Sequence, residues 1–301
     1  MTTLAWLVLF EAVLAAGLVG FDAAARLRRP SAVAWTLVTL ATAGLAASVY
    51  LVVRPSRAPT WGFAEVVALP LFFVLAILPF SLALDTLALH LGLLSSLGFI
   101  VTLTVVQNAI FAGASLYIAL IKYRLPRTSL GLAGGAWRRR LAAAALAAAA
   151  ALGGNFLGQT LTIFAAGLFI GRQAATELVT QQEAHTPVFR LLREFRAPAD
   201  VVMLAVLVAI VVPIGEEIFF RGLTYGAFRR KLGRHAAVLA SAAFFAAAHL
   251  SLVTLLPIVI LGMILAYLYE YTGSLVPGMI AHAINNLAAL VLFYLSPIPS
   301  P

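Results

Sequence analysis

Two adjacent carboxylates, Glu216 and Glu217, lie in an otherwise apolar stretch of the sequence, and Arg221 follows shortly after them. A charged side chain at the centre of a membrane helix costs roughly 2.5 to 3.5 kcal/mol on insertion scales, so a pair of acids there indicates a function. Two later apolar segments each carry one histidine, His249 and His282. Ionisable groups of complementary chemistry on three successive hydrophobic segments predict a catalytic site inside a membrane.

The spacing of these residues predicts how their side chains share helix faces, because residues four apart lie on the same face. Glu217 and Arg221 are so spaced, which predicts a local ion pair. Glu216, about 100° further round the helix, would then point elsewhere. His282 and Asn286 also share a face and offer two neighbouring hydrogen-bond donors.

Peptide-bond hydrolysis is the chemistry that these residue types favour. A carboxylate removed from water becomes a stronger proton acceptor, and together with a neutral imidazole it can activate a water molecule. A second histidine and an amide can stabilise the oxyanion of a tetrahedral intermediate. Phe245, four residues before His249, would give that imidazole an aromatic neighbour. The set predicts hydrolysis without a covalent intermediate.

The composition predicts a polytopic membrane protein. Of 301 residues, 63% are hydrophobic and only 10% are charged, and the mean hydropathy is +1.03. A soluble domain carries about 25% charged residues. The absence of cysteine excludes disulfides and thiolate sites. The first apolar segment is expected to remain as a membrane span rather than to be a cleaved signal peptide.

The net charge of +9 fits a membrane protein rather than a nucleic-acid-binding protein, so no nucleic-acid partner is expected. The basic residues form short clusters between apolar segments, as in cytoplasmic loops. Residues 224–235 contain three arginines and a lysine without an acid, which predicts a cytoplasmic loop. Glu216 lies eight residues before this segment, roughly 12 Å deep at the rise of a helix, and His282 is at a similar predicted depth.

Helical spans must position these residues, and about 20 apolar residues are needed for each. The sequence predicts an all-α, polytopic transmembrane helical bundle of eight to ten spans with an intramembrane catalytic cavity open to the cytoplasm. Residues 1–197 are predicted to form a transmembrane scaffold, with an amphipathic interfacial segment near 186–197, and residues 198–295 a catalytic core. The predicted spans are 2–23, 31–53, two or three within 61–121, 141–171, 201–223, 236–256, 257–271 and 274–295.

Three motifs resemble those of the type II CAAX-processing prenyl endopeptidases, which belong with bacteriocin-processing homologues (CPBP) to one intramembrane protease family. The run Glu216-Glu217-Ile218-Phe219-Phe220-Arg221-Gly222 resembles the family's EExxxRG motif. The segment 245–249 resembles its FxxxH motif, and the segment 282–286 resembles its HxxxN motif. The resemblance covers roughly residues 198–295.

The resemblance implies packed transmembrane helices around a cavity open to the cytosol. It also implies a role for each motif residue: water activation by Glu216 and His249, oxyanion stabilisation by His282 and Asn286, and support from Glu217, Arg221 and Phe245.

No cofactor is required on this interpretation. The family has also been described as metalloproteases, and a carboxylate with two histidines is a sensible zinc set. The alternative is therefore a Zn2+ ion held by Glu216, His249 and His282, although no HExxH sequence is present. The expected partners are the lipid bilayer and a membrane-associated or lipid-modified peptide or protein substrate. The expected location is the bacterial inner membrane, with the active site facing the cytoplasm.

Two other functions fit the same residues. Buried glutamate and histidine can form a proton relay in a proton-coupled transporter, but no inverted repeat pairs the two halves of the sequence. A non-catalytic immunity or scaffold homologue is the other alternative. Remaining polar residues, among them Asn155, Gln159 and Asn285, are predicted to bond or pack between helices, with Asn285 facing away from the site.

Overall fold

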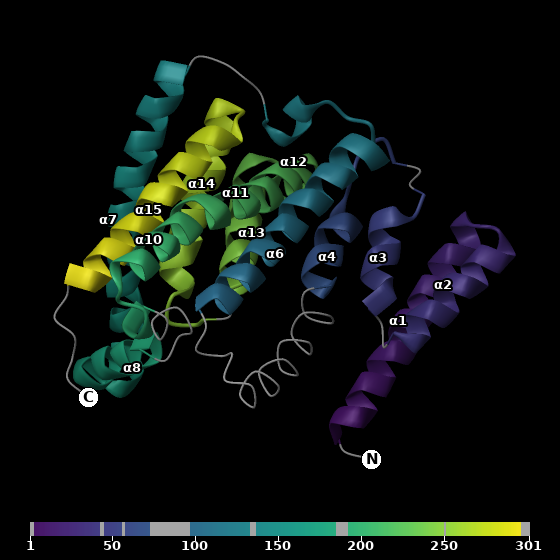
Figure 1. Cartoon of the computed structure of the whole chain (residues 1–301), viewed down its shortest axis with the longest axis horizontal. Helices are drawn as coiled ribbons and strands as arrows, with labels where there is room; N and C mark the ends of the chain where they lie inside the picture. Colours follow the sequence, from purple (N-terminus) through teal and green to yellow (C-terminus); the bar gives the residue numbers. More distant parts are fainter. Residues whose placement is uncertain are drawn as a thin grey trace. The chain divides into compact units, whose positions relative to one another are not determined.

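The computed structural model describes residues 3–42, 45–55, 58–72, 97–132, 137–184, 192–249 and 251–295, and every regular element in these ranges is helical (Figure 1). The all-α prediction is confirmed for this part of the chain. Five of its helices are long and apolar enough to cross a membrane, which indicates an integral membrane protein. These candidate spans are Val101–Lys122, Trp137–Ile170, Pro198–Leu232, Leu255–Thr272 and Leu275–Leu295.

The predicted count of eight to ten spans is not confirmed, and residues 73–96, where two or three spans were expected to continue, lie outside the described residues. Half of the predicted interfacial segment near 186–197, residues 186–191, also falls outside them. The chain divides into two compact units, residues 1–95 with 116–125 and residues 96–115 with 126–301. The division predicted at residue 197 stays a prediction.

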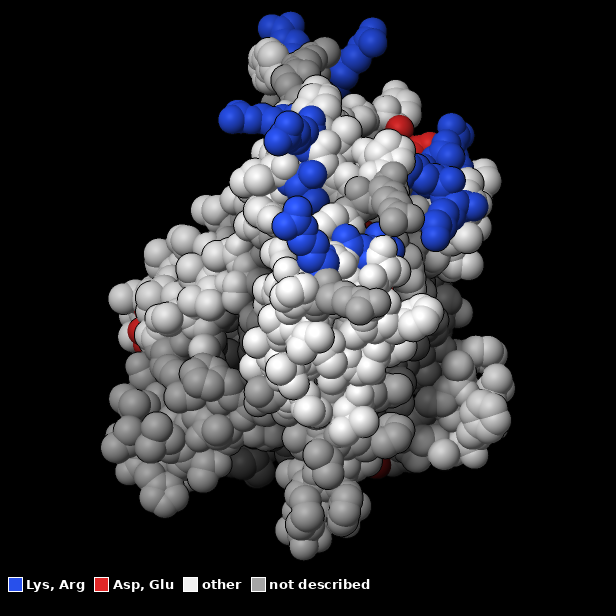
Figure 2. Space-filling model, turned by 90° about the vertical axis from the view of Figure 1, so that its right-hand side faces the viewer, with Lys and Arg blue, Asp and Glu red and all other residues white. Residues whose placement is uncertain are grey.

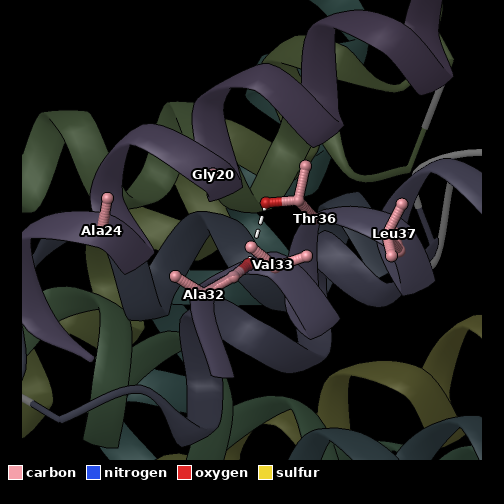
Figure 3. A pocket seen from close by; sticks show the side chains of 6 residues that line it. All are labelled: Gly20, Ala24, Ala32, Val33, Thr36 and Leu37. Carbon is pink, nitrogen blue, oxygen red and sulfur yellow. Dashed lines mark hydrogen bonds between the residues drawn. The ribbon is translucent and has the colours of Figure 1, made fainter. Parts of the chain in front are cut away.

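In the first unit, α1 (Thr3–Arg26) and α2 (Arg29–Ala41) pack closely because small residues line their contact. A side chain at Gly20 would place its Cβ 2.8 Å from Thr36 Oγ1. Figure 3 shows the hollow between the two helices, which measures about 280 Å³. Its single hydroxyl, on Thr36, donates to the Ala32 carbonyl, so this hollow has no reactive group.

The prediction of one span over residues 31–53 is wrong, because α2 ends at Ala41 and α3 (Leu45–Val53) is a separate helix. The Thr42 hydroxyl donates to Val38 O at 2.7 Å and accepts from Ala46 N at 3.1 Å, so it serves the ends of both helices. The unit also contains α4 (Phe63–Phe72) and the π-helix η2 (Tyr117–Lys122).

Two buried or half-buried polar clusters stabilise the first unit. Asp22 accepts from Arg26, Tyr50 and Arg54 at 2.9, 2.7 and 2.6 Å, which joins α1 to the end of α3. Lys122 Nζ lies 2.8 Å from Glu65 Oε1, and both side chains are buried. Each cation is therefore paired where water is scarce, as buried charges require.

The second unit contains the residues of the predicted site. Figure 1 shows α7, α14 and α15 running beside one another, and these helices pack together. Its elements are α6 (Leu97–Leu116), η3 (Arg127–Leu130), α7 (Trp137–Ile170), α8 (Arg172–Ala184), α10 (Pro198–Val206), η4 (Leu207–Val211), α11 (Val212–Glu217), η5 (Ile218–Tyr225), α12 (Gly226–Leu232), α13 (Arg234–Ala247), α14 (Leu255–Thr272) and α15 (Leu275–Leu295).

Small residues on α7 bring this helix close to α14. A Cβ on Gly158 would lie 2.6 Å from the backbone of Pro257, and one on Gly154 would lie 2.6 Å from Ile260 Cγ2. A side chain at Gly158 would therefore push the two helices apart, and one at Gly154 would displace the Ile260 side chain. Ala-rich turns precede these glycines on the same helix, and four of the alanines are buried. The small side chains thus let the polar second half of α7 reach the site.

Two predicted boundaries differ from the structure. Residues 236–256 do not form one span, because α13 ends at Ala247 and α14 begins only at Leu255. The predicted basic loop at 224–235 is helical as far as Leu232, and the chain turns at Gly233, whose φ is +76°. Glu270 on α14 explains how the basic turn is held, since it accepts from Arg229 at 3.0 Å and from Arg234 at 3.1 Å.

The charge distribution fits a membrane-embedded chain. Figure 2 shows one face, on which Lys and Arg side chains gather towards one end and most of the other described residues in view are uncharged. Clusters of basic residues beside uncharged surface are typical of the ends of membrane-spanning helices.

Candidate active site

A cavity of about 550 Å³ lies in the second unit, and its walls come from α7, α11, α13, α14, α15 and the turn after α13. Glu216, His249, His282 and Asn286 all line it. The structure thus brings the four predicted catalytic side chains to one cavity, although they come from segments up to 70 residues apart (216 to 286). The catalytic roles themselves stay predictions.

The ion pair predicted between Glu217 and Arg221 is confirmed. Arg221 Nη1 donates to Glu217 Oε1 at 2.7 Å, and both side chains are only 1% exposed. Arg221 is further held by the Gly262 carbonyl at 3.4 Å and by the face of the Phe245 ring, whose centroid lies 4.4 Å from the guanidinium carbon. This buried cation therefore anchors the carboxylate of Glu217 and the ring of Phe245.

His282 lies between the two glutamates. Its Nδ1 is 3.2 Å from Glu217 Oε1, and its Nε2 is 3.7 Å from Glu216 Oε2. His282 is 3% exposed and Glu216 is 14% exposed. A carboxylate that also accepts from Arg221 is a natural acceptor for the Nδ1 proton, so Nε2 is the nitrogen that faces Glu216. The more accessible carboxylate is therefore Glu216.

The two glutamates differ in what surrounds their second oxygens. Among the described residues, neither Glu216 Oε2 nor Glu217 Oε2 has a hydrogen-bond partner. Glu217 Oε2 faces Gly278, where an added Cβ would lie 2.8 Å away. Glu216 instead lines the cavity, so its carboxylate can meet a reactant there. Helix spacing alone predicted this separation of the two acids.

His249 lies just after the end of α13, not in the middle of a membrane span, and it is hydrogen-bonded to the last turn of that helix. Its Nδ1 lies 2.8 Å from the carbonyl oxygen of Phe245, which sits one turn earlier. A carbonyl only accepts, so Nδ1 carries a proton, and in the neutral imidazole Nε2 keeps its lone pair. The Phe245 ring packs edge-on against both imidazoles, with centroid distances of 4.8 Å to His249 and 5.9 Å to His282. Phe245 thus orients both rings.

The helix that carries the glutamates is interrupted by wider turns. The π-helices η4 and η5 flank α11, and π-helical turns occur frequently at functional sites. The carbonyl of Val208, within η4, accepts a hydrogen bond from Asn286 Nδ2 at 2.9 Å. Asn286 is therefore attached to the same long helix that presents Glu216.

Three amides that were not predicted as part of the site also line the cavity: Asn155, Gln159 and Asn285. The prediction that Asn155 bonds between helices is confirmed by its hydrogen bond with Asn285. The prediction that Asn285 faces away from the site is wrong, because the side chain lies in the cavity wall and accepts from Asn155 Nδ2 at 2.7 Å. Asn155 and Gln159 are four residues apart, and this shared face of α7 was the signal that could have identified them.

The zinc alternative is not supported by the side-chain geometry. Within the described part of the chain, no group of three or more His, Cys, Asp or Glu side chains is placed to hold a metal ion. Glu216, His249 and His282 share the cavity, but they do not form such a group. Whether activity requires zinc stays a question for experiment.

Comparison with family models gave one match, which covers residues 198–288 and is described as type II CAAX prenyl endopeptidase Rce1-like. The comparison with curated proteins and the comparison with solved structures each found no match. The matched segment includes both glutamates, both histidines and Asn286, and it supports CAAX-type intramembrane protease activity. Residues 198–288 of this chain, less than half of its length, therefore match the family of Rce1-like type II CAAX prenyl endopeptidases.

Proposed function

We propose that this protein is an intramembrane endopeptidase that hydrolyses a peptide bond in a membrane-associated or lipid-modified peptide. The observation that carries the proposal is the single cavity lined by Glu216, His249, His282 and Asn286, within a chain that has five candidate membrane spans. The family match at residues 198–288 supports the same reaction class.

Glu216 and His249 are proposed to activate the attacking water. Glu216 has a carboxylate oxygen without a hydrogen-bond partner among the described residues, and His249 has a lone pair on Nε2. Both side chains line the cavity, where a water held between them could give up a proton as its oxygen attacks the peptide carbonyl carbon. General bases of this kind contribute typically about 10²- to 10⁴-fold to a rate.

His282 and Asn286 are proposed to stabilise the oxyanion that forms on the former carbonyl oxygen. Asn286 would donate from its NH2 group, and His282 would donate from Nε2 as an imidazolium, since its Nδ1–H is directed at Glu217. Both lie on α15, one turn apart, and both line the cavity. When the intermediate collapses, the C–N bond breaks and the proton taken from water passes to the leaving amine. Glu217 and Arg221 hold His282 in place through the contact of Glu217 Oε1 with Nδ1.

The proposed location is a bacterial inner membrane, with the cavity open to the cytoplasm. Arg229 and Arg234 lie around the turn that follows the glutamate helix, and Glu270 holds them. Basic residues at helix ends favour the cytoplasmic side of a membrane, which supports this orientation.

The proposal is tested with the purified full-length protein in detergent and a library of internally quenched peptides. We expect wild-type protein to cleave some of these peptides and Glu216→Gln to lose about 100-fold or more of the rate, since the amide cannot accept the proton. Glu177→Gln, on an exposed face of α8, is the matched control and should retain full activity.

A parallel reaction with a chelator tests the need for a metal ion, and unchanged cleavage is expected. Cleavage by Glu216→Gln at the wild-type rate would remove Glu216 from the reaction. Absence of cleavage by the wild-type protein across the library, with normal elution as a folded species, would count in favour of a scaffold or transport role.

A further inference from the structure

A chain of three amides links α7 to the proposed oxyanion hole. Asn155 Nδ2 donates to Asn285 Oδ1 at 2.7 Å, and Asn285 Nδ2 donates to Asn286 Oδ1 at 3.5 Å. Asn286 Nδ2 in turn donates to the carbonyl of Val208 at 2.9 Å. This row of hydrogen-bonded amides therefore begins at Asn155 on α7, a helix that lies outside the segment matched to the protease family.

The Val208 carbonyl sets the direction of these hydrogen bonds at one end, and the Asn155 donor holds Asn285 in the matching orientation at the other. The Val208 carbonyl can only accept, so Asn286 must present its NH2 group to it. Asn286 Oδ1 then faces Asn285 and needs a donor there, which in turn leaves Asn285 Oδ1 to accept from Asn155. Reversing any one amide would set two acceptors or two donors against each other and leave a buried polar group without its hydrogen bond.

This direction matters for the proposed reaction. The NH2 group of Asn286 has two hydrogens, and the Val208 carbonyl takes one of them. The second hydrogen is left to donate to a substrate oxygen in the cavity that Asn286 lines. A flipped Asn286 would instead present an acceptor to the oxyanion, which would repel it.

The position of Asn155 on α7 is held tightly. The neighbouring Gly154 and Gly158 pack against α14 so closely that a Cβ on either would contact Ile260 or Pro257 at 2.6 Å. Asn285 is 5% exposed, so its hydrogen bond with Asn155 forms out of contact with bulk water. A donor fixed in this way can hold its acceptor in a single orientation.

We propose that Asn155, acting through Asn285, is a positioning residue that fixes the amide of Asn286 with its NH2 group towards the substrate. This inference rests on the proposed function, since it assigns a further residue to the same oxyanion hole. It also gives part of the N-terminal region a role in catalysis beyond that of a membrane scaffold.

The test is the kinetics of Asn155→Ala and Asn155→Leu on the best-cleaved peptide of the library. We expect kcat to fall roughly tenfold, because a misaligned donor retains only part of the 10²- to 10³-fold effect of an oxyanion-hole group. KM should stay unchanged, because the oxyanion exists only after attack. The alanine variant suits the Ala-rich helix, and the leucine variant keeps a branched side chain, so agreement between them excludes a simple volume effect. Thr160→Ala, on an exposed face of α7, is the matched control.

The decisive measurement repeats Asn155→Ala in an Asn286→Ala background under single-turnover conditions. If Asn155 acts through Asn286, the second substitution should cause no further loss. A peptide aldehyde, whose hydrate mimics the tetrahedral intermediate, gives a second readout: its inhibition constant should rise by the same factor as kcat falls.

Three results would overturn the inference: an unchanged kcat, an equal loss in both backgrounds, or a rise in KM that accounts for the loss. The proposed function is judged separately by Glu216→Gln. An inactive Glu216→Gln with a fully active Asn155→Ala would reject only the role of Asn155, whereas a fully active Glu216→Gln would reject the proposed reaction.

Discussion

The buried guanidinium of Arg221 gives the sharpest prediction about stability. It is 1% exposed, and its partner Glu217 is equally buried. Replacing it with methionine keeps much of the apolar stem but removes the positive charge. In Arg221→Met the Glu217 carboxylate would stay buried. Its Oε1, which accepts from Arg221 in the wild type, would keep only the contact with His282 Nδ1.

Breaking a buried ion pair by removing one partner destabilises a protein by about 3 to 5 kcal/mol, because the other charge is left uncompensated. A change of 1 kcal/mol shifts Tm by about 2 to 4 °C in a protein of this size class. The expected fall in Tm is therefore about 6 to 20 °C. The lost contact with the Phe245 ring adds in the same direction.

The double variant Glu217→Gln/Arg221→Met separates charge from packing. It removes both charges together, and replacing a complete buried pair by uncharged groups is often nearly neutral. We therefore expect it to recover most of the Tm lost in Arg221→Met. Arg139→Met, at an exposed position on α7, is the matched control and should leave Tm unchanged.

The assay heats detergent-solubilised protein in steps and measures the folded fraction by size-exclusion chromatography. A Tm for Arg221→Met within about 2 °C of wild type, a shift worth no more than about 1 kcal/mol, would refute the reasoning, since the pair would then contribute little. A double variant less stable than the single variant would show that packing, rather than an unpaired charge, causes the loss.

Two glycine substitutions test the close approaches around the site. Gly278→Ala should lower kcat with a smaller effect on Tm, because its Cβ would lie 2.8 Å from Glu217 Oε2 and displace the carboxylate that contacts the imidazole of His282, which is proposed to stabilise the oxyanion. Unchanged peptide cleavage would contradict this. Gly158→Val should lower Tm by several degrees, because its Cβ would lie 2.6 Å from the Pro257 backbone, and overpacking of this kind costs about 1 to 3 kcal/mol. Gly153→Ala is the control for Gly158→Val, since no atom lies within 4 Å of its added Cβ. Equal Tm values for these two variants would show that α7 is not closely packed at Gly158.

Local spacing predicted the features of the site that depend on one helix. The ion pair of Glu217 with Arg221 follows from the geometry of a single helical turn, as does the different direction of Glu216. The spacing of four also predicted Phe245 as the aromatic neighbour of His249, and the two ring centroids lie 4.8 Å apart, although His249 itself lies in the turn just after α13. Such contacts are set by the helix itself, so they can be read before the fold is known.

Helix boundaries were less accessible to sequence reasoning. Residues 236–256 are apolar enough for one span, yet α13 ends at Ala247 and a turn separates it from α14. Hydropathy does not distinguish one long helix from two helices joined by an apolar turn. The consequence is local but important, since His249 lies in that turn and not within a helix.

The amino-acid sequence by itself determined that this is a helical membrane protein, and it determined which acid, imidazole and amide side chains carry the proposed chemistry. Only the tertiary structure decided that His282 lies between the two glutamates and that Asn155, 130 residues from Asn285, bonds to it in the cavity wall. The physical reason is that helix periodicity fixes neighbours within one turn, whereas contacts between helices depend on how closely their small residues allow them to pack.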